Sequence, residues 1–125
     1  MRESPQNVEL LTDLYELTMA ASYFGHFLLT ELLLDTLKKS APSRMLIVSS
    51  VVHQGSESNR PMVHLDDLNY KNRDYNNFRA YEEAKVAVVL YAKELAERLK
   101  GTGVTTASVH PGWARSNFGS GGGFF

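Results

Sequence analysis

The sequence contains no cysteine, which excludes disulfide bonds and thiolate metal sites. It also carries little net charge, because 13 Lys and Arg face 14 Asp and Glu, for a formal net charge of -1. Nucleic acids and anionic membranes attract an excess of positive charge, so neither partner is expected. No run of about 18 uncharged apolar residues occurs, and residues 1–24 lack the layout of a signal peptide. We therefore expect no membrane segment and a cytoplasmic chain.

The remaining composition is that of a globular α/β chain. Its 125 residues are 43% hydrophobic, which allows one domain at most. The apolar run at 45–50 is typical of a strand buried in a parallel sheet, and residues 104–109 (VTTASV) are predicted as a second strand. An amphipathic run at 79–100 lies between them and predicts a helix, so strand, helix and strand form one βαβ unit. Residues 4–39 show a second helical pattern, with Gly25 as an expected bend.

Tyr81 and Lys85 stand in the spacing Tyr-x-x-x-Lys within the helix predicted at 79–100. Four residues are about one helical turn, so the phenol and the ammonium project from one face. A fixed cation beside a phenol favours the phenolate and lowers its pKa toward the working range of an acid–base catalyst. Tyr81 is thus a candidate proton carrier and Lys85 the group that tunes it. A Tyr and a Lys one turn apart on an amphipathic helix usually have no such role, so the pair needs context.

Ser50 supplies part of that context, because the strand predicted at 45–50 ends in two hydroxyl side chains. Ligand sites of open α/β sheets lie at the carboxyl ends of the strands. Ser50 is therefore expected to hydrogen-bond the same substrate oxygen that Tyr81 protonates. The strand at 104–109 runs in turn into the segment HPGWARS at 110–116.

Six blocks, in order along the chain, carry a resemblance to a known family. They are GHFLLTELLLDTLKKSAPSR at 25–44, VSS at 48–50, LDDLN at 65–69, AYEEAK at 80–85, ELAERLKGTGV at 94–104 and HPGWARS at 110–116. Together they resemble the carboxyl-terminal part of the cofactor domain of a short-chain dehydrogenase/reductase, most closely the retinol dehydrogenase group. The resemblance implies a Rossmann-like, doubly wound domain of which only the carboxyl-terminal half is present. It divides the chain into a foreign helical segment at 1–24, a partial dehydrogenase domain at 25–118 and a flexible tail at 119–125.

The resemblance implies a catalytic role for three residues. Tyr81 would exchange a proton with the carbonyl or hydroxyl oxygen of the substrate, and Ser50 would steady that oxygen. Lys85 would tune Tyr81 and also hold the nicotinamide ribose. The implied substrate is a small-molecule alcohol or carbonyl compound such as retinol or its aldehyde.

The implied cofactor is NADP or NAD. Tyr81 and Lys85 would both lie at its binding site, and Pro111 and Gly112 would line the nicotinamide side. Ser116 stands where the family usually has a Thr that contacts the carboxamide.

Two departures from the family pattern bear on activity. A catalytic Asn of the family falls on Ser22 here, which puts the usual proton relay in doubt. The sequence also has no Thr-Gly-x-x-x-Gly-x-Gly turn, whose backbone N–H groups and following helix would bind the pyrophosphate. We therefore expect an oxidoreductase fragment that is inactive by itself. The alternative is a non-catalytic truncated or fusion product that acts only through dimerisation.

Residues 51–78 are polar and rich in turn-forming residues, and in the family this segment passes over the substrate. The resemblance therefore makes residues 51–53 candidate pocket residues. The four histidines show no metal-ligand spacing, so no metal site is predicted. Asp66 and Asp67 are interpreted as a solvated turn rather than as an acid–base pair.

Residues 10–24 do not follow the dehydrogenase pattern. Their sequence, LLTDLYELTMAASYF, resembles the amino-terminal motif of nicotinate phosphoribosyltransferase, in which the residue matching Tyr15 lies against the nicotinate ring. A transferase fragment is the most remote of the three functional hypotheses. The simpler interpretation is an amphipathic helix.

Self-association is expected from two features. In the family, the helices matching 26–39 and 79–100 pair with their copies in a second subunit, which predicts a homodimer. With only two clear strands, the edge of the strand at 45–50 and the apolar helix faces should be exposed. Marginal stability, with dimerisation or aggregation, follows.

Overall fold

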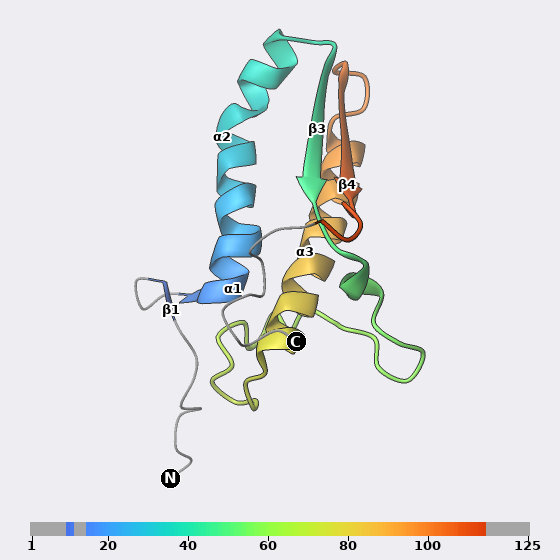
Figure 1. The fold of residues 1–125 in the computed structure, drawn as a ribbon. Coiled ribbons are helices and arrows are strands. Elements are labelled where there is room, and N and C mark those ends of the chain that lie inside the picture. The colour runs from blue at the N-terminus through green and yellow to red at the C-terminus, as the bar shows by residue number, and fades with distance from the viewer. Residues whose placement is uncertain (1–9, 12–14, 115–125) are drawn as a thin grey trace.

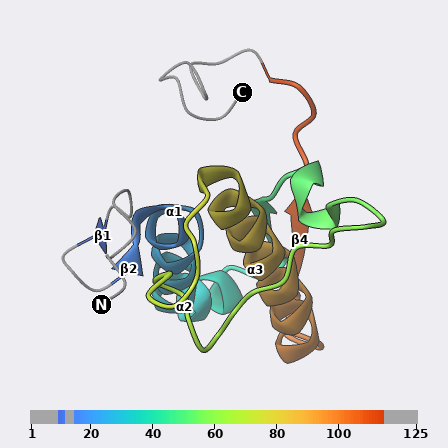
Figure 2. The same cartoon turned by 90° about the horizontal axis from the view of Figure 1, so that it is seen from below.

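The computed structural model describes residues 10–11 and 15–114, and its centre is a two-stranded parallel sheet. Figure 1 shows a long helix behind the two strands and a second long helix beside them. Figure 2, seen along the helices, shows that the two helices lie next to each other. In chain order the elements are β1 (Leu10–Leu11), β2 (Tyr15–Glu16), α1 (Leu17–Met19), η1 (Ala20–Phe24), α2 (Gly25–Lys39), β3 (Ser43–Val48), η2 (Val51–Gln54), α3 (Asn77–Arg98) and β4 (Val104–Val109).

The central sheet consists of β3 and β4 with α3 as the crossover, as the βαβ prediction requires. The strands run parallel, with Ser43 opposite Val104 and Val48 opposite Val109. The Ser49 N–H extends the ladder by donating to the Val109 carbonyl at 2.8 Å. The strand predicted at 104–109 is confirmed at its exact bounds, whereas β3 begins two residues earlier than predicted and ends before the two serines.

The helix α3 lies within two residues of the bounds predicted for it at 79–100. The side-chain oxygen of Asn76 caps its first turn by accepting from the Arg79 N–H at 3.0 Å. The helix ends at Arg98, Leu99 is its C-cap, and Gly101 follows with a φ of 77°. Glycine adopts this left-handed conformation without a steric cost, which explains the stop.

The helix before the sheet runs without a break through α1, η1 and α2, from residue 17 to residue 39. The helix predicted over 4–39 is wrong at residues 10–11 and 15–16, because β1 and β2 form a short antiparallel pair there. The Glu16 side chain accepts from the N–H groups of Thr18 and Met19 and thereby caps the helix after this pair. Residues 17–24 are helical as predicted, and residues 1–9 and 12–14 lie outside the described residues.

The main hydrophobic core lies between the two long helices and one face of the sheet. Leu95 and Val88 of α3 are fully buried in it, and Leu34 of α2 and Ile47 of β3 join them from the other elements. Burial of such side chains supplies most of the free energy that holds a helix against a sheet. The core therefore fixes α3 to the face of the sheet that carries Ile47.

The helix that runs through α1, η1 and α2 has one further property. Among the described residues, it is long and apolar enough to cross a membrane by length and composition, with a mean hydropathy of 1.3 over its best window. This finding qualifies the expectation that the chain has no membrane segment. It is a weak indication, because core helices of soluble proteins and signal sequences pass the same test.

Candidate functional site

Lys85 connects α3 to the carboxyl end of β3. Its ammonium donates to the Val48 carbonyl at 3.0 Å, and its own carbonyl accepts from the Ser49 hydroxyl at 3.1 Å. Lys85 is 8% exposed, and this burial lowers the pKa of its ammonium. These two bonds hold Lys85 against Val48 and Ser49, the two residues that precede Ser50 in the chain.

Tyr81 lies one turn before Lys85 on α3, as the spacing predicted. The Lys85 ammonium is 5.4 Å from the centroid of the Tyr81 ring, which is within the range of a cation–π contact. Tyr81 is half-buried, so its ring is accessible in part from solvent. The structure thus brings the predicted proton carrier and the predicted cation together on one face of α3.

Ser50 heads the short 3-10 helix η2, which packs against α3. Its hydroxyl accepts a long hydrogen bond from the Val52 N–H at 3.4 Å, and its carbonyl contacts the His53 ring. A hydroxyl that accepts one bond still has its own proton to donate. Ser50 is thereby positioned at the end of β3 that Brändén's rule assigns to ligands.

The residues predicted for the nicotinamide side lie on the surface after β4. Pro111 and Gly112 follow β4 at the same edge of the sheet and are exposed. Gly112 has a φ of 74°, and a Cβ added to it would meet no atom within 4 Å. The space beside Gly112 is thus open to a ligand, although no described side chain closes it. Ser116 lies outside the described residues.

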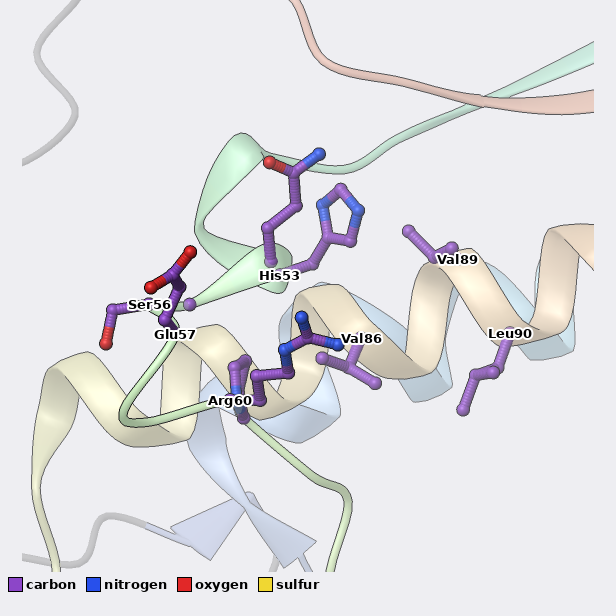
Figure 3. A pocket seen from close by; sticks show the side chains of 10 residues that line it. His53, Ser56, Glu57, Arg60, Val86, Val89 and Leu90 are labelled. Carbon is purple, nitrogen blue, oxygen red and sulfur yellow. The ribbon is translucent and has the colours of Figure 1, made fainter.

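A hollow of about 570 Å³ lies between α3 and the loop that follows η2. Figure 3 shows His53 and Arg60 on the loop side and Val86, Val89 and Leu90 along α3. Val89 is one turn beyond Lys85, so the hollow begins where the candidate site ends. Of the three candidate pocket residues, His53 lines this hollow and Val51 and Val52 do not.

A buried charged cluster holds the loop before α3, and sequence reasoning missed it. Arg73 makes two hydrogen bonds to Glu83, at 2.7 and 3.2 Å, and its guanidinium lies 4.1 Å from the centroid of the Tyr70 ring. Asp67 accepts from the backbone N–H groups of Lys71 and Asn72. Burial alone would raise the pKa of Asp67, but these N–H groups and Arg73 outweigh it and lower the pKa.

The interpretation of Asp67 as part of a solvated turn is therefore wrong. Asp67 is 7% exposed, and it organises the turn from inside because its carboxylate satisfies two backbone donors. Asp66 is exposed, as predicted. The signal in the sequence was the basic residue Arg73 between two acidic residues, Asp67 and Glu83. Because Glu83 is two residues after Tyr81, the cluster fixes the part of α3 that carries the candidate site.

Ser22, at the position of the family's Asn, lies in an irregular turn of its continuous helix. The π-helix η1 spans it, and the Gly25 N–H donates to the Ala20 carbonyl, five residues back. Such π-turns occur frequently at functional sites. The irregular turn is present here, although the side chain at its centre is a half-buried hydroxyl instead of an amide. Gly25, the expected bend, keeps helical backbone angles. The irregular turn lies just before it, at Ala20–Phe24.

The chain has clear relatives among known proteins. It is 47% identical to human Retinol dehydrogenase 13 over 107 residues, which cover 86% of this chain and 31% of that protein. Human Retinol dehydrogenase 14 is 44% identical over the same share of the chain, and human Retinol dehydrogenase 12 is 47% identical over 104 residues. The chain thus spans about a third of the length of these relatives. No protein-family model matches the sequence.

A solved structure shares the fold. An uncharacterized protein from Mycobacterium Paratuberculosis matches with a TM-score of 0.73 at 31% identity, over 94% of this chain and 41% of that one. The predicted fold class, a partial Rossmann-like domain, is confirmed by this match and by the parallel βαβ unit. Over the matched residues, the chain is a retinol dehydrogenase-like segment of the short-chain dehydrogenase/reductase family.

Proposed function

We propose that this chain supplies the proton-handling part of an NAD(P)-dependent oxidoreductase site that interconverts an alcohol, such as a retinoid, with its carbonyl form. The observation that carries the proposal is the placement of the Lys85 ammonium 5.4 Å from the Tyr81 ring, at the carboxyl end of β3. The names of the relatives support the substrate class.

The proton path follows from the chemistry of the side chains. In the direction of reduction, Tyr81 donates its phenolic proton to the carbonyl oxygen while Ser50 donates a hydrogen bond to the same oxygen. The positive charge of Lys85 stabilises the tyrosinate that remains. A bound nicotinamide would supply the hydride for the carbonyl carbon. In the direction of oxidation, the tyrosinate takes the proton of the alcohol.

The described residues fit one end of the cofactor better than the other. Lys85 can turn from Val48 toward a ribose, and the open space at Gly112 suits the nicotinamide. The sequence has no glycine-rich turn for the pyrophosphate, where most of the binding energy of a dinucleotide arises. We therefore propose that the chain alone does not turn over.

Titration of the purified chain with NADPH, followed by nicotinamide fluorescence and by reduction of retinal, tests this inactivity. We expect neither saturable binding nor turnover. Turnover that disappears in the variant Tyr81→Phe would contradict the inactivity and support the assigned role of Tyr81.

The catalytic assignment is tested in a chimera in which residues 25–118 replace the matching region of human Retinol dehydrogenase 13. We expect the chimera to oxidise or reduce a retinoid, and Tyr81→Phe to lower kcat by at least about 100-fold, as loss of a positioned acid–base group does. Phe78→Tyr, at an exposed position of α3, is the matched control and should leave kcat unchanged. An active Tyr81→Phe chimera would remove Tyr81 from the mechanism.

A second candidate function is dimerisation, and one specific observation favours it. Four leucines of α2 are exposed, between 44% for Leu33 and 72% for Leu32. A contiguous apolar surface of this kind is typical of a protein interface. Size-exclusion chromatography with light scattering tests the proposal, and a monomer at every concentration would contradict it.

A further inference from the structure

Two hollows adjoin along α3, and the candidate site accounts for neither of them. The first is the hollow of about 570 Å³ between α3 and the loop after η2. The second has a volume of about 610 Å³ and lies between α3, the helix before the sheet and residues 61–68 of the loop. Pro61, Val86 and Leu90 line both. The two hollows are therefore neighbours on either side of the point where the loop crosses α3.

The second hollow is apolar and has aromatic walls. The ring centroid of Tyr91 lies 5.0 Å from that of Phe27 and 6.1 Å from that of Tyr23. Met62 and Leu65 line the same hollow and are 62% and 81% exposed. Sites for small molecules are typically concave, about 300–1,000 Å³ in volume, and lined mostly by hydrophobic and aromatic side chains. An apolar ligand here would remove these side chains from water.

Arg60 brings an unpaired positive charge to the first hollow. Figure 3 shows its side chain reaching from the loop toward Val86 of α3. Among the described residues, neither Arg60 nor Glu57, which lines the same hollow, has a side-chain hydrogen bond or ion pair. The guanidinium that lines the second hollow, Arg98, already makes two hydrogen bonds to Glu31. Arg60 is thus the guanidinium that can bind a carboxylate through two parallel N–H groups.

The loop that carries Arg60 is closed tightly by its own backbone. Ser56 and Asn59 exchange two backbone hydrogen bonds, at 3.2 and 3.1 Å. Gly55 has a φ of 61°, and a Cβ added to it would lie 2.4 Å from the Asn59 carbonyl oxygen and 2.4 Å from the Pro61 ring. Only glycine fits at this position. The loop is therefore shaped before a ligand arrives, which lowers the entropic cost of binding.

We propose that the two hollows form one binding site for a long-chain carboxylate, whose carboxylate pairs with Arg60 and whose hydrocarbon chain runs past Leu90 into the second hollow. A purely apolar ligand would leave Arg60 unpaired, and a small anion would leave the apolar walls uncovered. Neither Tyr81 nor Ser50 is among the described residues that line the two hollows. The ligand is therefore not the substrate of the proposed redox reaction, and its binding does not depend on that reaction.

Isothermal titration calorimetry of the purified chain with octanoate, decanoate and dodecanoate, each below its micelle concentration, tests the site. We expect saturable binding of one molecule per chain. The affinity should rise about twofold to fourfold for each added methylene, because each one leaves water for an apolar wall. Dodecanol has the same chain without the charge and should bind at least about 10-fold more weakly than dodecanoate. The absence of saturable binding, or an affinity that does not change with chain length, would overturn the proposal.

A pair of charge variants tests the role of Arg60. Arg60→Gln should weaken dodecanoate binding at least about 10-fold and remove the preference for dodecanoate over dodecanol. Glu57→Gln removes a negative charge beside the same hollow and should strengthen binding by about twofold. Both side chains are exposed, so neither variant should affect folding. Equal affinity in Arg60→Gln and the parent chain would overturn the proposal.

Leu90→Glu tests the passage between the hollows. Leu90 is 56% exposed, so the variant should fold, but its carboxylate would meet the hydrocarbon chain and should abolish binding of dodecanoate. Lys93→Ala, at an exposed position of α3 outside both hollows, is the control and should bind normally. Retained binding in Leu90→Glu would overturn the proposed path of the chain.

Two other occupants of this surface are distinguished by the same titration. Binding to phosphatidylglycerol vesicles without binding of free dodecanoate would assign the surface to a membrane and overturn the proposal. Dodecanoate affinity that falls as the concentration of the protein rises would show that a second copy covers the second hollow, and this result would also overturn it.

Discussion

The two faces of the β3–β4 sheet are made by alternate residues of the same strands, yet their surroundings are opposite. On the inner face Ile47 is 6% exposed and packs with Leu95 of α3, whereas on the outer face Leu46 is 65% exposed. Their side chains are equally apolar, so the difference comes from the elements that surround the sheet. The inner face is covered by α3, whereas no described element covers Leu46 on the outer face.

The candidate site lies on the boundary between these regions. Tyr81 and the backbone of Lys85 belong to α3, which the core and the charged cluster hold firmly. The Lys85 ammonium reaches the unpaired edge of β3. Preorganised catalysis requires both regions to be fixed. The candidate site thus has one side that the core holds and another at an edge of β3 that no described strand pairs with.

The largest expected effect comes from truncating side chains on the inner and outer faces of the sheet. Leu95→Ala on the inner side should lower the free energy of unfolding by about 3 kcal/mol, because it leaves a cavity around a fully buried position. Leu46→Ala on the outer side is the matched control and should change it by less than about 0.5 kcal/mol. Urea unfolding followed by circular dichroism measures both. Equal effects would show that the outer face is covered in solution.

Asp67→Asn tests whether the loop before α3 belongs to the firmly held region. It should lower the free energy of unfolding by about 2 kcal/mol at pH 7, because a buried carboxylate loses charge-assisted bonds to two backbone N–H groups. The pKa of Asp67 is lowered in the folded state. Its contribution is therefore fully present above the unfolded value of about 3.9, and it is lost as the pH falls through the folded pKa.

Urea unfolding at several pH values between 7 and 3 measures this dependence. The difference between the parent chain and Asp67→Asn should shrink toward the acidic end. Asp66→Asn changes the charge at the exposed neighbouring position and should have little effect at any pH. A pH-independent difference for Asp67→Asn would rule out the titration of this carboxylate as the cause.

The sequence predicted the regular elements well because their signals are local. The apolar run before Ser49 and the helical period around Lys85 require no knowledge of distant residues. The charged cluster was missed because Arg73 meets Glu83 only after the loop has folded back on α3. The bond between Lys85 and Val48 was likewise unpredictable. It depends on which edge of β3 is left unpaired, a property of the assembled sheet.

Asn76→Ala tests the boundary between the loop and α3. It should lower the free energy of unfolding by less than Asp67→Asn does. The Asn76 side chain accepts from the Arg79 N–H at the start of the helix, and loss of such a cap costs about 1 kcal/mol. Asn77→Ala, at the first exposed position of α3, is the control, since it removes no capping bond. Thermal unfolding compares the two variants. A Tm equal to that of the control would mean that the charged cluster alone fixes the helix start.

Leu32→Lys should have the smallest effect on folding and a clear effect on association. Leu32 is 72% exposed on α2, so a lysine there should change the free energy of unfolding by less than about 0.5 kcal/mol. The added charge should disrupt any apolar contact with another molecule, because an unpaired ammonium is costly to bury. Light scattering should show a lower average mass than for the parent chain. If Leu32→Lys instead unfolds the monomer, this face of α2 is packed within one molecule. Leu32 would then belong with the buried residues of the core and not with the exposed apolar surface.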